Sequence, residues 1–120
     1  MRVFKNTWFT RFADKEGITD SELKEMVNQL EAEQADADLG GSVYKVRVAW
    51  SGEGKSGGYR VIVFFKSGER TFYVYGFAKS DRSNLDQKET REYKALAKKY
   101  LNLSDEMIER AIQSGKFVEI

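Results

Sequence analysis

The spacing of apolar residues changes at Gly40 and Gly41, and this change constrains the fold more than any other feature of the chain. Before the glycines, apolar residues recur at the interval that gathers them on one face of an α-helix, at Leu23, Met26, Val27 and Leu30. After them, apolar residues alternate with polar ones as in a half-buried strand, at Tyr44, Val46, Val48 and Trp50. The chain therefore begins with helices and continues into a sheet.

Two helices are predicted before the glycines. Residues 7–15 carry aromatic side chains at helical spacing, and Gly17 can end that helix in the left-handed conformation. Thr19 is followed three residues later by Glu22, which predicts a capping box at the start of the second helix. We assign the aromatic residues of these and later elements to the core, in particular Trp8, Phe9, Phe12 and Phe72.

Short glycine-containing connections separate the predicted strands, which lie at residues 43–50, 59–66 and 70–77. Three such strands in succession predict an antiparallel meander. Two helices follow it, one over residues 86–101 and one that Ser104 can cap, and residues 116–120 are expected to form a short extended tail. The sequence therefore predicts a single α+β domain over residues 1–120.

Composition excludes several classes of site. The chain has no cysteine and no histidine, so thiol nucleophiles, disulfides and the commonest metal ligands are missing, and we expect neither a metal nor a cofactor. Any proton transfer must then fall to Lys, Tyr, Asp, Glu or water. The longest apolar runs are too short to cross a membrane, and we expect a soluble cytoplasmic protein.

Charge is segregated along the chain, although the net charge is only +1. Residues 13–38 hold nine acidic and two basic residues, which we interpret as a solvated face, whereas residues 41–79 hold seven basic and two acidic residues. Within the basic region, Lys45 and Arg47 project from the same face of the first predicted strand. A local cationic field of this kind can bind a polyanion.

The stretch GEGKSGGYR, residues 52–60, has the composition of a phosphate-binding loop. Such a loop works because it leads into a helix whose N-terminus points at the phosphates. Here it leads into the β-branched and aromatic run that begins at Tyr59, so a nucleoside triphosphate site is excluded. The loop is instead predicted to be a cation-tipped hairpin between the strand of Lys45 and Arg47 and the strand of Arg60.

These residues resemble the RelE/HigB-like toxins of bacterial type II toxin–antitoxin modules nearly end to end. Four stretches carry the resemblance, in the expected order: TWFTRFADKEGITDSEL (7–23), ADLGGSVYKVRVA (37–49), GKSGGYR (54–60) and YGFAKSDRSNL (75–85). The resemblance implies N-terminal helices packed on a small antiparallel sheet with a C-terminal helix behind it, which agrees with the periodicity.

The resemblance further implies cleavage of messenger RNA, in better-studied relatives while it occupies the ribosomal A site. It places Arg60 and Arg47 as phosphate clamps and Lys45 or Lys79 in proton transfer or charge neutralisation. It also implies that Lys55, Tyr59 and Tyr75 bind RNA.

Two positions depart from the family pattern. Some relatives carry a second arginine where this chain has Ser80, and a tyrosine near the position of Leu85 and Asp86. The general base is therefore left open among Tyr75, Asp81 and a lysine of depressed pKa.

Two other functions stay open at this point: inhibition of DNA gyrase by protein contact, and non-catalytic binding of RNA or the ribosome. The partner implied by the resemblance is an antitoxin, expected to be a small helix-turn-helix protein. It would cover either the basic sheet face or the acidic helices at 7–34.

Overall fold

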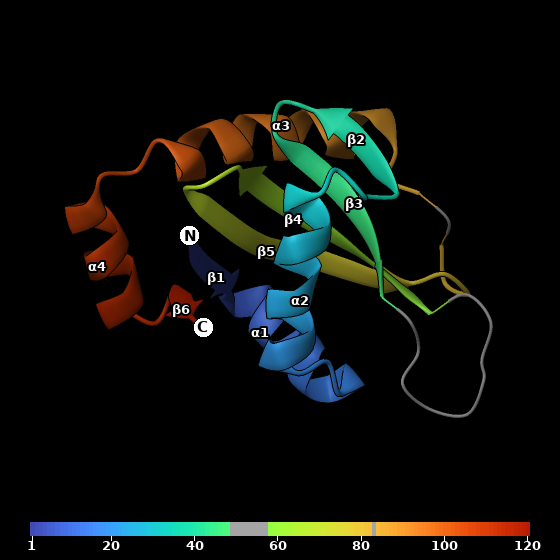
Figure 1. The fold of residues 1–120 in the computed structure, drawn as a ribbon, viewed down its shortest axis with the longest axis horizontal. Helices are drawn as coiled ribbons and strands as arrows, with labels where there is room; N and C mark the ends of the chain where they lie inside the picture. The colour runs from blue at the N-terminus through green and yellow to red at the C-terminus, as the bar shows by residue number, and fades with distance from the viewer. Residues whose placement is uncertain (49–57, 83) are drawn as a thin grey trace.

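The computed structural model describes residues 1–48, 58–82 and 84–120, and within these residues it consists of one sheet with helices on both faces (Figure 1). The strands are β1 (Arg2–Asn6), β2 (Ala37–Gly40), β3 (Val43–Val48), β4 (Tyr59–Lys66), β5 (Arg70–Ala78) and β6 (Phe117–Glu119). The helices are α1 (Thr7–Glu16), α2 (Asp20–Glu31), α3 (Gln87–Leu101) and α4 (Asp105–Gln113). The strand order is β2-β3-β4-β5-β1-β6, so the predicted α+β class is confirmed.

The predicted meander forms the centre of the sheet, because β3, β4 and β5 pair antiparallel in sequence order. The sequence did not reveal β1, which pairs parallel with β5 and antiparallel with β6. The middle residues of β1, Val3, Phe4 and Lys5, are all buried, so the strand shows no alternation of apolar and polar residues. The buried Lys5 amine lies 2.9 Å from the Asp20 carboxylate at the start of α2.

Two apolar cores lie on opposite faces of the sheet. One is shared with α1 and α2 and includes Phe9, Leu23 and Tyr73. The other is shared with α3 and α4 and includes Phe72 and Ile108. Both faces of β4 and β5 are therefore buried over most of their length, which fixes the register of the strands that carry the site.

The start of α1 determines where the edge of β5 becomes open. Asn6 ends β1 and caps α1, because its side-chain oxygen accepts a hydrogen bond of 2.7 Å from the Phe9 N–H. The same amide donates to the Val74 carbonyl of β5 at 3.1 Å. Beyond Tyr73, the last residue of β5 that pairs with β1, no described strand covers this edge of β5.

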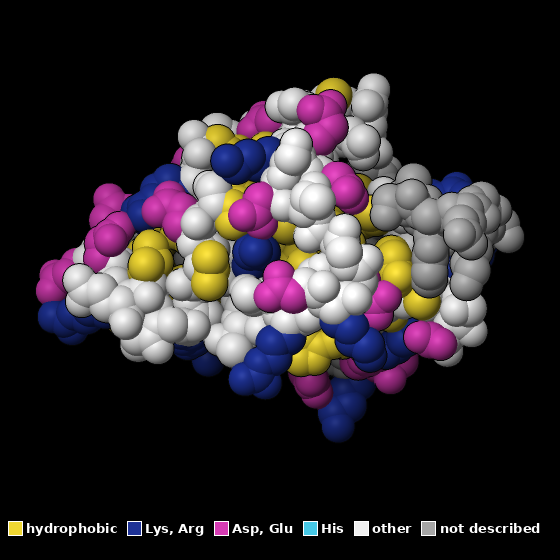
Figure 2. All heavy atoms as spheres, turned by 90° about the horizontal axis from the view of Figure 1, so that it is seen from below, with side chains coloured by type: hydrophobic (Ala, Val, Ile, Leu, Met, Phe, Trp, Pro, Cys, Tyr) yellow, Lys and Arg dark blue, Asp and Glu magenta, His cyan; other side chains and the backbone are white. Residues whose placement is uncertain are grey.

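Charged side chains of both signs are interspersed on the face seen in Figure 2. Several acids of residues 13–38 nevertheless bond the helices to the sheet. The interpretation of this segment as only a solvated face was therefore incomplete. Glu31 accepts hydrogen bonds from the Ser67 hydroxyl at 2.6 Å and the Gly68 N–H at 2.9 Å. These bonds lower the pKa of Glu31.

Trp8 does not belong to the core, contrary to its assignment from the sequence. Phe9 and Phe72 are fully buried and Phe12 is partly buried, but Trp8 is 44% exposed. The helical spacing places Trp8 at the margin of the buried face of α1, where the indole packs on Phe12 and Tyr75 while its outer surface faces solvent.

Candidate functional site

Cross-strand pairing sets two arginines opposite each other. Arg47 on β3 is the register partner of Arg60 on β4, and Arg60 is in turn opposite Phe77 on β5. Directly opposed residues project from the same face of a sheet, so these three side chains form one row. Phe77 belongs to the core on the α3 side, so the row lies on that face.

The next row toward α3 contains Lys45, Ile62 and Tyr75. The Lys45 amine donates a hydrogen bond of 2.7 Å to the side-chain oxygen of Asn84, in the segment that leads into α3. This bond fixes the amine beside the arginine row. Arg47, by contrast, is exposed and makes no ion pair within the described part of the chain.

Arg60 is the most deeply placed of these cations, with 9% of the residue exposed. Its Nε lies 3.2 Å from a carboxylate oxygen of Asp36, which directly precedes β2. Its Nη1 donates to the Tyr59 carbonyl at 3.4 Å. These two contacts hold the guanidinium of Arg60 in position at the edge of the buried row.

Arg82 extends the cationic row and was not recognised in the sequence. Its guanidinium lies 5.4 Å from the centre of the Phe77 ring and forms an ion pair with Glu89 of α3. The resemblance pointed to some relatives with an arginine at the position of Ser80, whereas this chain carries Arg82 two residues later. Sequence spacing could not reveal the place of Arg82, because it depends on the turn after β5. In this turn the backbone N–H groups of Asp81 and Arg82 donate to the Ala78 carbonyl. We define the basic face as the surface formed by Lys45, Arg47, Arg60 and Arg82.

Two tyrosines border the basic face. The rings of Tyr75 and Tyr93 lie 6.0 Å apart, one on β5 and one on α3. Burial raises the pKa of Tyr93 to about 12, so its hydroxyl stays protonated at neutral pH and can donate but not remove a proton. Tyr75, a candidate base and RNA-binding residue from the sequence, shares the row of Lys45.

The remaining candidates from the sequence lie at the margin of the basic face or away from it. Lys79 directly follows β5 and is exposed, and its backbone N–H donates to the Gly58 carbonyl at 3.1 Å. Tyr59 lies on the α1 side of the sheet, where its hydroxyl donates to Glu16 at 2.6 Å, and burial is the main cause that raises its pKa to about 12. Asp81 lines a hollow beside α1. Lys55 and its loop lie outside the described residues.

The ion pair of Arg82 and Glu89 predicts a dependence of stability on pH. Hydrogen bonds from Arg82 and from the Asp86 N–H lower the pKa of Glu89 from 4.5 to about 2. A depressed carboxyl pKa stabilises the fold above the unfolded value of 4.5, and this contribution is lost as the pH falls toward 2. Because both side chains are about a third exposed, we expect Glu89→Gln to cost about 1 kcal/mol at neutral pH and nothing near pH 2.

Urea denaturation of the wild type and Glu89→Gln across this pH range measures the difference. Glu106→Gln, which removes an exposed pair with Arg110 on α4, is the matched control and should change stability by less than about 0.5 kcal/mol. A Glu89→Gln difference that stays constant with pH would contradict the role of its ionisation.

The described residues provide no cluster of acidic side chains that could hold a metal ion, and none of their helices is long and apolar enough to cross a membrane. The fold and the basic face thus define a small α+β protein with clustered cations on one end of a sheet. The model of the family described as "RelE toxin of RelE / RelB toxin-antitoxin system" matches residues 1–120, and the chain belongs to this family. The resemblance to RelE toxins is thereby confirmed, and membership implies an antitoxin partner.

Proposed function

We propose that this toxin inhibits translation by cleaving messenger RNA at the basic face, with the messenger held in the ribosomal A site. The opposition of Arg47 and Arg60 across β3 and β4 carries this proposal. Two guanidinium groups on neighbouring strands offer paired N–H donors to the oxygens of one phosphate. The basic face thus suits a phosphodiester substrate.

The reaction needs orientation and stabilisation of charge more than a cofactor. In RNA cleavage of this kind the 2′-oxygen attacks the adjacent phosphorus, the bond to the 5′-oxygen breaks, and one proton moves from the nucleophile while another reaches the leaving group. Negative charge that develops on the phosphate is stabilised by fixed cations. Arg47 and Arg60 act as clamps, Lys45 is held in place by Asn84, and Arg82 or Lys79 adds charge at the margin.

The test compares two double variants that remove the same charge. Lys45→Ala/Arg47→Ala removes the two cations that β3 contributes to the basic face. Lys99→Ala/Arg110→Ala removes two exposed cations from α3 and α4. On induction in cells, we expect wild type and the second variant to arrest growth and to produce codon-phased 5′-ends in primer extension. The first variant should lower cleavage about 100-fold or more. Growth arrest with intact messenger RNA would refute the proposal and favour gyrase as the target.

We also infer that the antitoxin is a small helix-turn-helix protein that covers the basic face. The exposed Arg47 would then be buried in the complex, and RNA could no longer reach Arg60. A toxin–antitoxin complex that still binds RNA as tightly as the free toxin would contradict this inference and direct attention to the helices at 7–34, of which α2 is acidic.

A further inference from the structure

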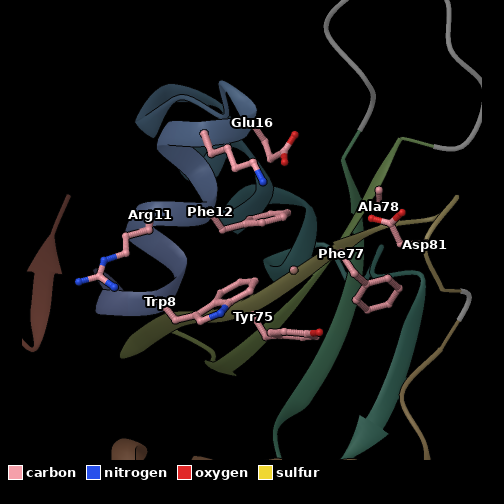
Figure 3. Close-up of a pocket in the computed structure, with 10 residues that line it drawn as sticks. Trp8, Arg11, Phe12, Glu16, Tyr75, Phe77, Ala78 and Asp81 are labelled. Atoms are coloured by element: carbon pink, nitrogen blue, oxygen red, sulfur yellow. The ribbon is translucent and has the colours of Figure 1, made fainter.

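A hollow of about 460 Å³ lies between α1 and the open edge of β5, and the basic face does not include it (Figure 3). We call it the aromatic groove and define it by Trp8, Phe12, Tyr75, Gly76 and Asp81, which line it with their neighbours on the same elements. From the geometry we propose that the aromatic groove binds one unpaired base of an RNA strand, stacked on Trp8. The proposal rests on the proposed function for RNA as the ligand.

The first support is a cluster of three rings in which the central ring, Trp8, is 44% exposed. The ring centres of Trp8 and Phe12 are 5.2 Å apart with planes inclined by 18°, and the Trp8 and Tyr75 centres are 4.6 Å apart. Figure 3 shows the three rings gathered on one side of the groove. An exposed indole held by two other rings is a preformed platform, and a base that stacks on such a platform gains about 1–3 kcal/mol.

Glycine at residue 76 is required for this arrangement. A Cβ at this position would lie 2.4 Å from Cε2 and 2.8 Å from Cζ of Phe12, so the Phe12 ring can rest on the strand only where there is no side chain. The ring of Phe12 is also held edge-on by Tyr59 at 5.7 Å. The floor of the platform is therefore fixed by packing from the sheet.

The second support is the open backbone edge of β5. The Lys79 N–H donates to the carbonyl of Gly58, the residue opposite it on the β4 side. In an antiparallel pair, hydrogen-bonded residues alternate with residues whose N–H and C=O point away from the partner strand. The backbone groups of Gly76 and Ala78 therefore point away from β4. An adjacent N–H and C=O of this kind can hydrogen-bond the edge of a base. The Ala78 carbonyl is occupied by the following turn and the Val74 carbonyl by Asn6. The free stretch is thus too short to template a β-strand of a partner protein.

The third support is the charge around the groove. Arg11 and Lys15 lie one helical turn apart on α1 and both line the groove, so they can pair with the backbone phosphates of a bound strand. The neighbouring Glu16 also lines the groove, and its carboxylate accepts a hydrogen bond from the Tyr59 hydroxyl. Asp81 stands on the opposite side from the rings (Figure 3) and offers a carboxylate acceptor. A carboxylate accepts from the amino group of cytosine, whereas uracil presents a carbonyl there. The groove should therefore prefer cytosine to uracil.

Tyr75 connects this groove with the basic face. Its ring contacts Trp8 on one side and lies 6.0 Å from both Phe77 and Tyr93 on the other. Arg82 covers Phe77. An RNA strand held by its phosphate at the basic face can thus pass around the edge of β5 and place a neighbouring base on Trp8.

Fluorescence of Trp8 tests the proposal without cleavage or ribosomes. The chain contains two tryptophans, so a Trp50→Phe background leaves Trp8 as the only indole. The probes are short oligocytidylate and oligouridylate with 2′-O-methyl groups, which cannot be cleaved. We expect saturable quenching, with the cytidine probe bound about tenfold more tightly. Asp81→Asn should abolish this preference, because an amide can donate to uracil as well as accept from cytosine.

Anisotropy of a labelled oligocytidylate measures affinity independently of the indole. Trp8→Ala should weaken binding about tenfold or more, and Trp8→Phe should retain most of it. The proposal would be overturned if the oligonucleotide bound without quenching Trp8, or if it did not bind at low salt. It would also be overturned if Trp8→Ala left RNA affinity intact but weakened antitoxin binding. Quenching by a toxin that cuts no messenger RNA would uphold the groove and refute the proposed function. Cleavage of messenger RNA by a toxin whose oligonucleotide binding is unaffected by Trp8→Ala would uphold the proposed function and refute the aromatic groove as a base site.

Discussion

Replacing Arg60 by alanine is expected to lower the rate of messenger RNA cleavage about 100- to 1,000-fold, because a fixed donor to the developing phosphate charge is removed. Arg60 is 9% exposed and lies opposite Arg47, and the other described cation of β4, Lys66, stands at the far end of the strand. Arg60→Lys should restore only part of the rate, since an ammonium lacks the planar fork that binds two oxygens at once. Single-turnover cleavage on programmed ribosomes measures the effect.

Asp36→Asn is the control that separates catalysis from folding. The substitution breaks the same ion pair as Arg60→Ala but leaves the guanidinium in place. We expect Asp36→Asn to remain within about tenfold of the wild-type rate, and to bind RNA somewhat more tightly because a competing anion is lost. If Asp36→Asn is as inactive as Arg60→Ala while both remain folded, Arg60 is not the phosphate ligand and the pair has a structural role.

Replacing Phe72 by alanine is expected to cost about 3–5 kcal/mol of unfolding free energy. Phe72 is fully buried at the centre of the core beneath α3. Its ring centre lies 4.9 Å from that of Phe4, 5.2 Å from Phe117 and 5.3 Å from Tyr100. These contacts join β5, β1, β6 and α3, so the cavity would weaken every element that meets at this point.

Urea denaturation followed by far-UV circular dichroism measures the loss. Phe72→Leu, which retains most of the side-chain volume, should cost less than about 1.5 kcal/mol. Because a domain of this size has about 5–15 kcal/mol of stability, the alanine variant is expected to lose a large fraction of it and to unfold at a clearly lower urea concentration. A loss below about 1 kcal/mol for Phe72→Ala would show that the ring is not packed as described.

The central elements were predictable because their patterns are local. Thr19 and Ser104 cap α2 and α4 as expected from the sequence, and β3 to β5 form the predicted meander. The reciprocal capping box predicted for Thr19 and Glu22 is found instead at Asp86 and Glu89 of α3. The strands β1 and β2 were missed. Each is short, and β2 exists because of its pairing with β3, which no local pattern of apolar residues indicates.

The site was only partly predictable for the same reason. Lys45 and Arg47 follow from the alternation within one strand, but their distance from Arg60 depends on the pairing register of two strands. Arg82, Asn84 and Asp36 reach the site through turns and side-chain bonds between distant segments. Trp8 was assigned to the core because helical spacing cannot tell a buried position from the margin of a buried face.

The sequence alone determined the class of the fold, the family and the cations available to the site, because these depend on local periodicity, composition and short motifs. Only the tertiary structure decided that Arg47 and Arg60 face each other and that Arg82 joins them. It also decided that β5 has an open edge beside Trp8. These features arise from pairing and packing between residues far apart in the chain, and their energies depend on neighbours that the linear order does not specify.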